Sequence, residues 1–370
     1  MRIAVLGAGL IGSAAARHLA LAGHDVTLIG PGEPKDWAGH RGVFASHYDE
    51  GRITRGIDFT PFWAEVSRAS IGRYGDIAAA SGIDFFTEVG GVMAALDLSR
   101  VAEDGAAAGL DLHRLAPVEA RALGYHLPNT VSVLHEASRA GHISPRRLVA
   151  AQQAAGAALG VSRVEEVVHE VNLGRVTTDQ SEHEFDQVLW AAGGFGAPHL
   201  DLPLNVQGRT VVYFEISEAE ALRRAQMPTL ILENGRVIDI YLLPPIRYPD
   251  GRWYFKIGGG PHDRPLRTEM EMRRWFKSGG DPEAARSLSA IFRTLVPDAA
   301  VVSESIAPCV TTYTPDDLPV IGRLDDRTCV ATAGCGRGAK CSDELGRLGA
   351  LAVTGDVDAR LDPGRFSRAA

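Results

Sequence analysis

Apolar positions along the chain follow in turn the spacing of strands and of amphipathic helices. The first such unit is residues 2–30, RIAVLGAGLIGSAAARHLALAGHDVTLIG, where an apolar run, a glycine turn, a helical pattern and a second apolar run follow one another. This order predicts a strand, a helix and a second strand, which together have the length of a βαβ unit.

Helical periodicity returns further along the chain. It covers residues 62–81, 144–160, 269–279, 282–296 and 342–355. Ser144 is expected to be the N-cap of the second of these helices, and Pro145 its first helical residue, because a serine oxygen and a proline suit these two positions.

Strand-like patterns fill most of the rest. Residues 164–196 have the pattern of a small β-meander followed by a buried strand, Val188–Ala192, which ends at Gly193 and Gly194. These glycines suit a second glycine-lined edge of a nucleotide site. Short runs rich in β-branched and aromatic residues between 210 and 264 predict an antiparallel sheet.

The domain organisation follows from the C-terminal part, where a strand, glycine and helix pattern returns after Asp316. We therefore predict an α/β fold in which a Rossmann-like nucleotide domain is discontinuous and carries an inserted, mostly antiparallel β domain. The nucleotide domain is predicted to comprise residues 1–80, 139–205 and 300–370. The inserted substrate domain is predicted to comprise residues 81–138 and 206–299. A chain of 370 residues is long enough for two such units.

Composition and charge narrow the class of partner. The chain is 45% hydrophobic and 23% charged, with a formal net charge of -8. That balance provides no basic field for nucleic acid or anionic lipid, and no segment reaches the roughly 18 to 20 uninterrupted apolar residues of a membrane span. We expect a small-molecule partner, no nucleic acid, no membrane, and a monomer or small homo-oligomer.

The cysteines indicate the compartment. The chain has four of them, at Cys309, Cys329, Cys335 and Cys341, with no C-x-x-C pair and no zinc-type ligand spacing. This usage predicts a reducing, cytoplasmic environment. Glycines interrupt the apolar N-terminus, which therefore does not suit a signal peptide. The scattered histidines suggest no metal.

Gly7, Gly9 and Gly12 form a G-x-G-x-x-G motif directly after the first strand. In a dinucleotide site the first glycine allows the turn, the second lets a pyrophosphate approach the backbone, and the third lets helix and strand pack closely. The alternative is a glycine-rich turn without a ligand. The acidic residue that usually ends the second strand is missing, since the strand ends at Gly30; Glu33 either substitutes for it or is a solvated loop carboxylate.

Together with this motif, four further segments carry a resemblance to a known family. They are SHYDEGRITR (46–55), YLLPPIRYPDGRWYFKIGG (241–259), PCVTTYTPDDLPVIG (308–322) and GCGRGAKCS (334–342). The chain resembles the FAD-dependent amine oxidases of the D-amino-acid oxidase superfamily over nearly its whole length. It is most similar to monomeric sarcosine oxidase and its relatives, which include N-methyltryptophan, pipecolate and fructosyl-amino-acid oxidases.

The resemblance implies FAD as the cofactor and assigns residues to it. Cys309 matches the cysteine that these enzymes bond to the 8α carbon of FAD, although a cysteine taken alone is more often a small buried hydrophobe. The residues expected to contact FAD are Gly7, Gly9, Gly12, Ser46, His47, Arg52, Gly193, Cys309, Gly336, Gly338 and Lys340. For Arg52 and His47 an ordinary loop charge and a solvated histidine remain the alternatives.

The resemblance also implies four catalytic residues. Arg55 and Lys340 match the pair that binds the substrate carboxylate and orients the α-carbon over flavin N5. Lys256 matches the lysine over the flavin ring, where a cation stabilises the superoxide-like anion formed as oxygen is reduced. Tyr241 lies near the position of an active-site tyrosine. The alternatives are surface charges for Arg55 and Lys340, a solvent-facing strand lysine for Lys256 and a core tyrosine for Tyr241.

Some positions depart from the family pattern. Thr311 replaces a tyrosine of the substrate cavity, and Gly260 replaces a histidine, so we expect a larger or more polar substrate than sarcosine. His262 lies two residues beyond that histidine position. Arg337 replaces a small or imidazole side chain and adds a possible second anion contact.

The implied activity is oxidation of the C–N bond of an amino acid, one with a secondary (N-alkyl) or cyclic amine, to an imine, with reduction of O2 to H2O2. Three alternatives remain open at this point. They are an FAD-dependent amino-acid dehydrogenase that passes electrons to a carrier, a nicotinamide-dependent dehydrogenase, and a non-catalytic flavin-binding module.

Overall fold

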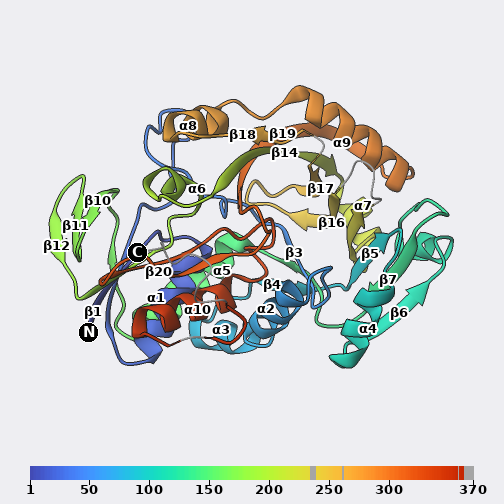
Figure 1. Cartoon of the computed structure of the whole chain (residues 1–370). Coiled ribbons are helices and arrows are strands. Elements are labelled where there is room, and N and C mark those ends of the chain that lie inside the picture. Colours follow the sequence, from blue (N-terminus) through green and yellow to red (C-terminus); the bar gives the residue numbers. More distant parts are fainter. Residues whose placement is uncertain (234–238, 261, 357, 362–370) are drawn as a thin grey trace.

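The computed structural model describes residues 1–233, 239–260, 262–356 and 358–361. Parts of three predictions lie outside the described residues: positions 234, 237 and 238 of the predicted strands, positions 357 and 362–370 of the predicted nucleotide domain, and positions 234–238 and 261 of the predicted substrate domain. Figure 1 shows the chain as two stacked sheet systems, one built around the N-terminal strand and the other above it.

The first system is a six-stranded sheet. In spatial order its strands are β20 (Val320–Arg323), β21 (Thr328–Thr332), β13 (Gln187–Trp190), β1 (Arg2–Leu6), β2 (Asp25–Ile29) and β9 (Ser162–Val164). All neighbours are parallel except β20 and β21. Strands from both ends and the middle of the chain thus form one sheet, which confirms the discontinuous Rossmann-like architecture.

Helices cover this sheet. They are α1 (Leu10–Leu21), α2 (Pro61–Ile71), α3 (Tyr74–Ser81), α5 (Pro145–Ala158) and α10 (Ser342–Thr354). The single helical pattern predicted over 62–81 is divided into α2 and α3. Ser144 caps α5 as predicted, because its hydroxyl accepts a hydrogen bond from the backbone N–H of Arg147 at 3.1 Å.

A buried network ties α1, α5 and α10 together. The Asp343 carboxylate, fully buried in the first turn of α10, accepts hydrogen bonds from Arg17 at 2.7 Å and from Gln152 at 2.9 Å. Burial alone would raise the pKa of Asp343, but contacts with His18, Arg73 and Arg17 hold it far below its usual value. The network fixes the start of α10, and with it the turn that precedes this helix.

The second system is a nine-stranded sheet. Its main path is β18 (Arg264–Pro265), β14 (Asn205–Ile216), β17 (Trp253–Gly259), β16 (Asp239–Arg247), β15 (Thr229–Glu233), β5 (Gly91–Ala95), β7 (Ser132–Glu136) and β6 (Leu112–Leu115), and β19 (Val301–Tyr313) pairs with β14. Except for the parallel pair of β15 with β5, neighbours are antiparallel. The predicted antiparallel sheet is confirmed.

Helix α9 (Pro282–Leu295) packs on the second sheet and closes its core. Phe292 of this helix stacks on Phe214 of β14 with ring centroids 3.8 Å apart.

The domain boundaries remain a prediction. The predicted boundaries assign β19 to the nucleotide domain, and β19 pairs along its length with β14 of the second sheet.

Two small sheets and several short elements complete the fold. The small sheets are β3 (Arg52–Thr54), β8 (Gly141–Ile143) and β4 (Phe86–Glu88), and the meander β10 (Val168–Asn172), β11 (Arg175–Thr178) and β12 (Glu182–Glu184). The remaining helices are α4 (Ser99–Ala107), η1 (Glu119–Leu123), α6 (Gly193–Gly196), η2 (Ala197–His199), α7 (Glu218–Arg223) and α8 (Glu269–Lys277).

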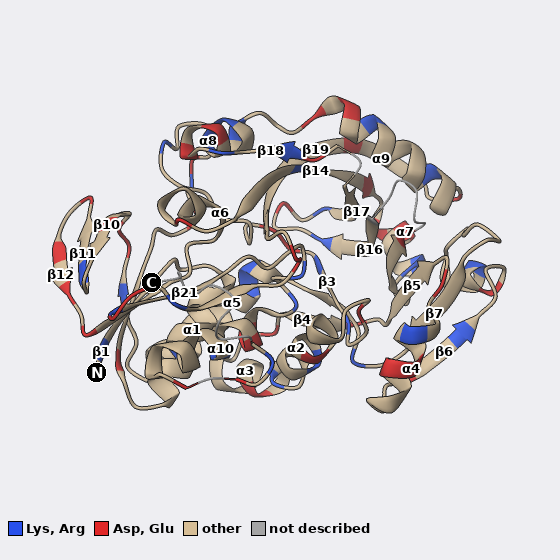
Figure 2. Cartoon of the chain, viewed as in Figure 1, with Lys and Arg blue, Asp and Glu red and all other residues tan. Residues whose placement is uncertain are grey.

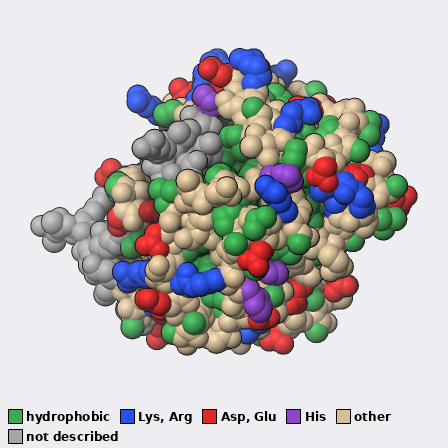
Figure 3. All heavy atoms as spheres, turned by 90° about the vertical axis from the view of Figure 1, so that its right-hand side faces the viewer, with side chains coloured by type: hydrophobic (Ala, Val, Ile, Leu, Met, Phe, Trp, Pro, Cys, Tyr) green, Lys and Arg blue, Asp and Glu red, His purple; other side chains and the backbone are tan. Residues whose placement is uncertain are grey.

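Charged side chains of both signs are spread over the molecule. Figure 2 shows Lys and Arg interspersed with Asp and Glu along the chain, and the face in Figure 3 mixes both signs with apolar side chains. Within the described residues, no helix is long and apolar enough to span a bilayer, and no group of three or more His, Cys, Asp and Glu side chains is arranged to hold a metal ion.

Candidate functional site

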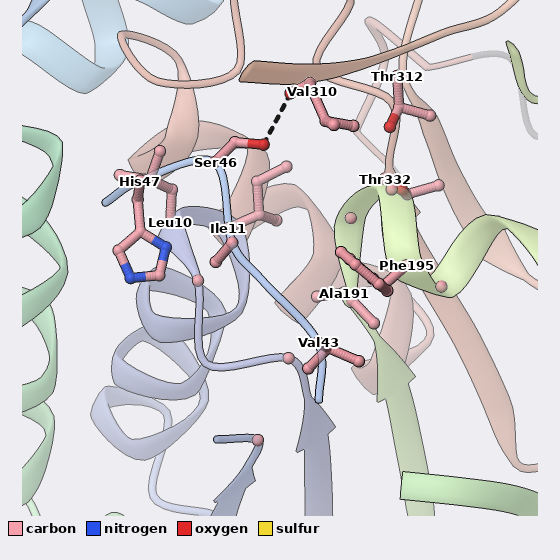
Figure 4. Close-up of a pocket in the computed structure, with 18 of the residues that line it drawn as sticks. Leu10, Ile11, Val43, Ser46, His47, Ala191, Phe195, Val310, Thr312 and Thr332 are labelled. Atoms are coloured by element: carbon pink, nitrogen blue, oxygen red, sulfur yellow. Dashed lines mark hydrogen bonds between the residues drawn. The ribbon is translucent and has the colours of Figure 1, made fainter. Parts of the chain in front are cut away.

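A cavity of about 300 Å³ opens at the carboxyl end of β1, against the N-terminus of α1. Its walls come from segments far apart in sequence: the β1–α1 turn, the loop 43–48, the end of β13, the C-terminal end of β19, and the end of β21 with the turn that follows it. Figure 4 shows Leu10, Ser46 and His47 on one side of this cavity and Ala191 and Phe195 on another. We call it the cofactor cavity.

The three glycines of the motif have two different structural roles. A Cβ on Gly12 would lie 1.9 Å from the carbonyl oxygen of Gly7, and Gly7 itself has a φ of 105°. Both glycines are therefore required by close packing and by the turn. At Gly9 the nearest atom to such a Cβ is Nδ1 of His47 at 3.7 Å, so this backbone is open to the cavity, as a phosphate-binding position requires.

Most of the predicted cofactor residues line this cavity. They are Gly7, Gly9, Ser46, His47, Arg52, Gly193, Cys309, Gly336 and Gly338. Gly12 lies behind the turn, and Lys340 lines a second cavity described below. The Ser46 hydroxyl donates to the carbonyl of Val310 at 2.7 Å, so it joins the loop 43–48 to β19 (Figure 4).

His47 is neutral in this position. Burial, and then the nearby Arg146 and Arg52 guanidinium groups, lower its pKa to about 3. Glu33 lies outside the walls of the cofactor cavity and is bound by Arg146 through two hydrogen bonds of 2.7 and 2.9 Å. Of the two interpretations of Glu33, the structure supports neither a contact with the cavity nor a freely solvated carboxylate.

Three polar atoms test whether a polar cofactor fits the cavity. Nε1 of Trp190 and the hydroxyls of Thr311 and Thr332 are buried and have no hydrogen-bond partner among the described residues. All three residues line the cavity. Buried polar groups normally have hydrogen-bond partners, so these three unpaired atoms are consistent with a polar ligand that supplies the missing partners. With the open backbone at Gly9, the residues present fit a dinucleotide such as FAD.

Cys309 is held at the boundary of this cavity. Its carbonyl accepts a hydrogen bond from Nε1 of Trp275 at 2.9 Å, and its Sγ lies 3.5 Å from Nη2 of Arg52. The strand is therefore fixed at Cys309 by Trp275, and the thiol lies next to a guanidinium group.

A second cavity of about 300 Å³ adjoins the first. The two share Arg52, Cys309, Thr311, Cys335, Gly336 and Ala339 as walls. The second is also lined by Arg55, Tyr241, Lys340 and Arg337, and we call it the substrate cavity. Three of the four predicted catalytic residues therefore lie together in it.

Arg55, Lys340 and Arg337 converge on a single carboxylate, that of Asp58. Nη2 of Arg55 donates to it at 3.1 Å, Nζ of Lys340 at 2.9 Å and Nε of Arg337 at 3.1 Å. Nε of Arg55 is buried with no partner among the described residues. Burial lowers the pKa of Lys340, and Asp58 opposes that shift. Arg337 is further engaged by Asp317 at 2.7 Å, so most of its donors are already used.

Lys256 lies apart from the other three predicted catalytic residues. It is fully buried on β17 and is not among the walls of either cavity. Its Nζ binds the Asp49 carboxylate and donates to the carbonyl of Gly51 at 2.9 Å, and it lies 5.5 Å from the ring centroid of Tyr241. Burial and then Arg52 lower its pKa well below the usual value. The alternative of a solvent-facing strand lysine is wrong.

Asp49 and Asp58 were not predicted from the sequence. Asp49 binds Arg52 and Lys256, and also accepts a hydrogen bond from Tyr248 at 2.8 Å. The signal was present as the spacing D-x-x-R-x-x-R-x-x-D over residues 49–58, in which each acid lies three residues outside an arginine.

The departures from the family pattern have local consequences. At Gly260 a Cβ would lie 2.9 Å from Nη2 of Arg209, so an arginine that lines the substrate cavity occupies the expected space. His262 lies outside the walls of both cavities, where its Nε2 is 3.2 Å from the hydroxyl of Ser287.

Comparisons with known proteins agree with this architecture. The sequence profile of a family described as DAO, FAD dependent oxidoreductase, matches residues 2–351. No curated protein gives a significant match.

Solved structures share the fold at low sequence identity. NikD, described as an unusual amino acid oxidase essential for nikkomycin biosynthesis, has a TM-score of 0.73 at 18% identity, covering 98% of this chain and 96% of its own. L-proline dehydrogenase from P. horikoshii has a TM-score of 0.76 at 17% identity, covering 99% and 97%. Amadoriase I from Aspergillus fumigatus has a TM-score of 0.72 at 18% identity, covering 98% and 88%.

Proposed function

The chain belongs to the family of FAD-dependent oxidoreductases, and we propose that it is an oxidase of the C–N bond of an amino acid with a secondary (N-alkyl) or cyclic amine. One observation carries this proposal. Arg55 and Lys340 lie together on Asp58 in a cavity that shares Cys309, Arg52 and Thr311 with the cofactor cavity. A carboxylate-binding pair next to a redox cofactor suits an amino-acid substrate.

The residues of the chain then have distinct tasks. Arg55 offers its unpaired Nε, and Lys340 its remaining N–H groups, to the substrate carboxylate, and two charged partners fix its orientation. Thr311 leaves room beside Cys309 for a substituent on the amine. FAD bound here would supply a two-electron acceptor for a hydride from the substrate carbon, while the proton of the amine would pass to solvent; the resulting imine would hydrolyse in water.

We propose Cys309 as the residue that holds FAD covalently, through a bond between its Sγ and the 8α carbon. Support comes from its place on the wall shared by the two cavities, where Nη2 of Arg52 lies 3.5 Å from its Sγ. Ser46, His47, Arg52, Gly193, Gly336 and Gly338 are proposed to contact the cofactor non-covalently.

For the electron acceptor we propose O2, reduced to H2O2, with Lys256 as the buried cation that favours this step. A dehydrogenase that passes electrons to a carrier is the second candidate. A specific observation favours it: Lys256 is paired with Asp49, so its charge is compensated. We also propose a cytoplasmic location, since all four cysteines are free thiols, and a monomer or small homo-oligomer.

The test begins with the purified protein and a Cys309→Ser variant, both precipitated with acid. We expect yellow colour in the wild-type pellet and in the supernatant of the variant. N-methyl and cyclic amino acids are then screened for anaerobic bleaching, and oxygen uptake is measured with each compound that bleaches.

Each result has a separate meaning. Colour that leaves the wild-type pellet contradicts the covalent bond. Bleaching without oxygen uptake supports the dehydrogenase over the oxidase. A yellow protein that no amine bleaches contradicts both and supports a flavin-binding module without this chemistry, and a colourless protein contradicts the flavin itself.

A further inference from the structure

Asp58 contacts three of the cations that line the substrate cavity, Arg55, Lys340 and Arg337. Its Oδ2 accepts from Lys340 and Arg55, and its Oδ1 from Arg337, at 2.9 to 3.1 Å. The Asp58 side chain is fully buried and does not itself line the cavity. It therefore lies behind the cations rather than in front of them.

The backbone around Asp58 is fixed, so the carboxylate keeps this place. The buried Glu136 carboxylate accepts hydrogen bonds from the N–H groups of Gly56 at 2.8 Å and Ile57 at 3.3 Å. The hydroxyl of Ser67 donates to the carbonyl of Arg55. The segment between β3 and α2 is thus anchored immediately before Asp58.

The three cations keep Asp58 ionised. Burial would raise its pKa, but Lys340, Arg55 and Arg337 hold the pKa well below its usual value, so the group is an anion. Three other carboxylates are near. Glu136 accepts hydrogen bonds from backbone N–H groups, Asp317 binds Arg337 from a half-exposed position, and Glu233 lines the substrate cavity.

We propose that Asp58 is a resident counter-anion of the carboxylate site: it compensates Arg55 and Lys340 when the cavity is empty, and so limits how tightly the site binds the carboxylate of substrate or product. This inference rests on the proposed amino-acid oxidase function. A site whose cations are already compensated gains less from an incoming anion, and releases a carboxylate product more readily.

The physical basis is the cost of an uncompensated buried charge. Removing one partner of a buried ion pair is strongly unfavourable, because the other charge remains without its partner. An external anion that restores the pairing regains that free energy, and it therefore binds more tightly. Asp58→Asn preserves the shape of the side chain and removes only its charge, so it isolates this effect.

The experiment measures the binding of propionate, a carboxylate without an amine, to the purified holoenzyme by titration calorimetry. It is run at about pH 6, since loss of Asp58 lowers the pKa of Lys340 further. In Asp58→Asn we expect the Kd of propionate to fall at least about tenfold. We also expect propionate to raise the midpoint of thermal unfolding more in the variant than in the wild type.

Two control variants locate the effect. Asp298→Asn removes a carboxylate that pairs with Arg224 away from both cavities, and its Kd should stay within about threefold of the wild type. Arg55→Gln should abolish propionate binding with or without Asp58, which shows that the anion binds at this site. If Asp58→Asn does not fold, Lys340→Gln is compared with Lys340→Gln/Asp58→Asn. The double variant also removes the charge of Lys340, so fewer buried cations are left without a counter-charge than in Asp58→Asn. The double variant must bind propionate more tightly than the single one.

The outcomes distinguish this inference from the function on which it rests. If propionate binds neither the wild type nor Asp58→Asn, the proposed carboxylate site is wrong. If propionate binds both with the same Kd, and Arg55→Gln abolishes that binding, the site is right and the role of Asp58 as a counter-anion is wrong. An equal Kd in the Lys340→Gln pair contradicts the inference in the same way.

Discussion

The two glycines at positions 9 and 12 should respond to alanine in opposite ways. Gly9 has a φ of -89°, which alanine adopts without strain, and the nearest atom to a new Cβ is 3.7 Å away. The free protein should therefore lose less than about 1 kcal/mol of stability. At Gly12 the Cβ would lie 1.9 Å from a backbone oxygen, so helix and strand must separate, and overpacking of this kind costs about 1–3 kcal/mol or more.

FAD binding, in contrast, should be weakened directly by Gly9→Ala. A methyl group on Gly9 projects into the cofactor cavity, where it would break at least one hydrogen bond between the backbone and a phosphate. Hydrogen bonds to charged groups contribute about 1.5–3 kcal/mol each, so the Kd of FAD should rise about 10- to 150-fold. In Gly12→Ala any loss of FAD should follow from the loss of the fold itself.

The assay is made in a Cys309→Ser background, so that the cofactor is held without a covalent bond. Thermal unfolding of the apoprotein by circular dichroism reports stability, and quenching of flavin fluorescence reports the Kd of FAD. The reasoning is refuted if Gly9→Ala binds FAD as the parent does, or if its apoprotein unfolds at as low a temperature as that of Gly12→Ala.

Three further predictions concern the substrate, the acceptor and pH. Arg55→Gln should lower kcat/KM for the best amino-acid substrate by about 10- to 150-fold, since one charged partner of the carboxylate is lost, whereas Arg209→Gln in the same cavity should change it far less; equal losses would contradict the assignment. Lys256→Met should slow reoxidation of the reduced protein by O2 at least about tenfold in stopped-flow experiments and leave anaerobic bleaching unchanged; an unchanged rate would favour the dehydrogenase. Hydrogen bonds from Arg347, Arg360 and Arg73 outweigh burial and lower the pKa of Glu344 from 4.5 to about 2. Because this folded-state pKa is depressed, the stabilisation by ionised Glu344 is present above about pH 4.5 and is lost as the pH falls towards 2. The unfolding midpoint of Glu344→Gln should therefore depend less on pH in that range than the midpoint of the wild type. Parallel pH profiles of the two proteins would contradict this.

The local features of the fold were predictable from the sequence. The glycine turn, the Ser144 cap and the β-rich region between 210 and 264 depend on short-range chemistry, and the structure has all of them. The division of the helix predicted over 62–81 into α2 and α3 was not foreseen, because its apolar spacing continues across the break at Gly72.

Individual residues of the site were predictable from the sequence, but their partners were not. Arg55, Lys340 and Tyr241 were expected in one site and line one cavity. Asp49 and Asp58 were missed although each lies three residues from an arginine that it binds, because their contacts with Lys256 and Lys340 join positions more than 200 residues apart. The space expected at Gly260 is likewise taken by Arg209, a neighbour that no local pattern reveals.

The segment 49–58 has a consequence for any attempt to alter what this protein accepts. Within these ten residues Arg52 lines both cavities and Arg55 lines the substrate cavity, and each arginine is paired with an aspartate that lines neither. A designer who randomises this segment to change the substrate would therefore disturb the flavin environment at the same time. Libraries aimed at specificity alone should instead vary Ile231 and Val211, which line the substrate cavity and are not among the walls of the cofactor cavity.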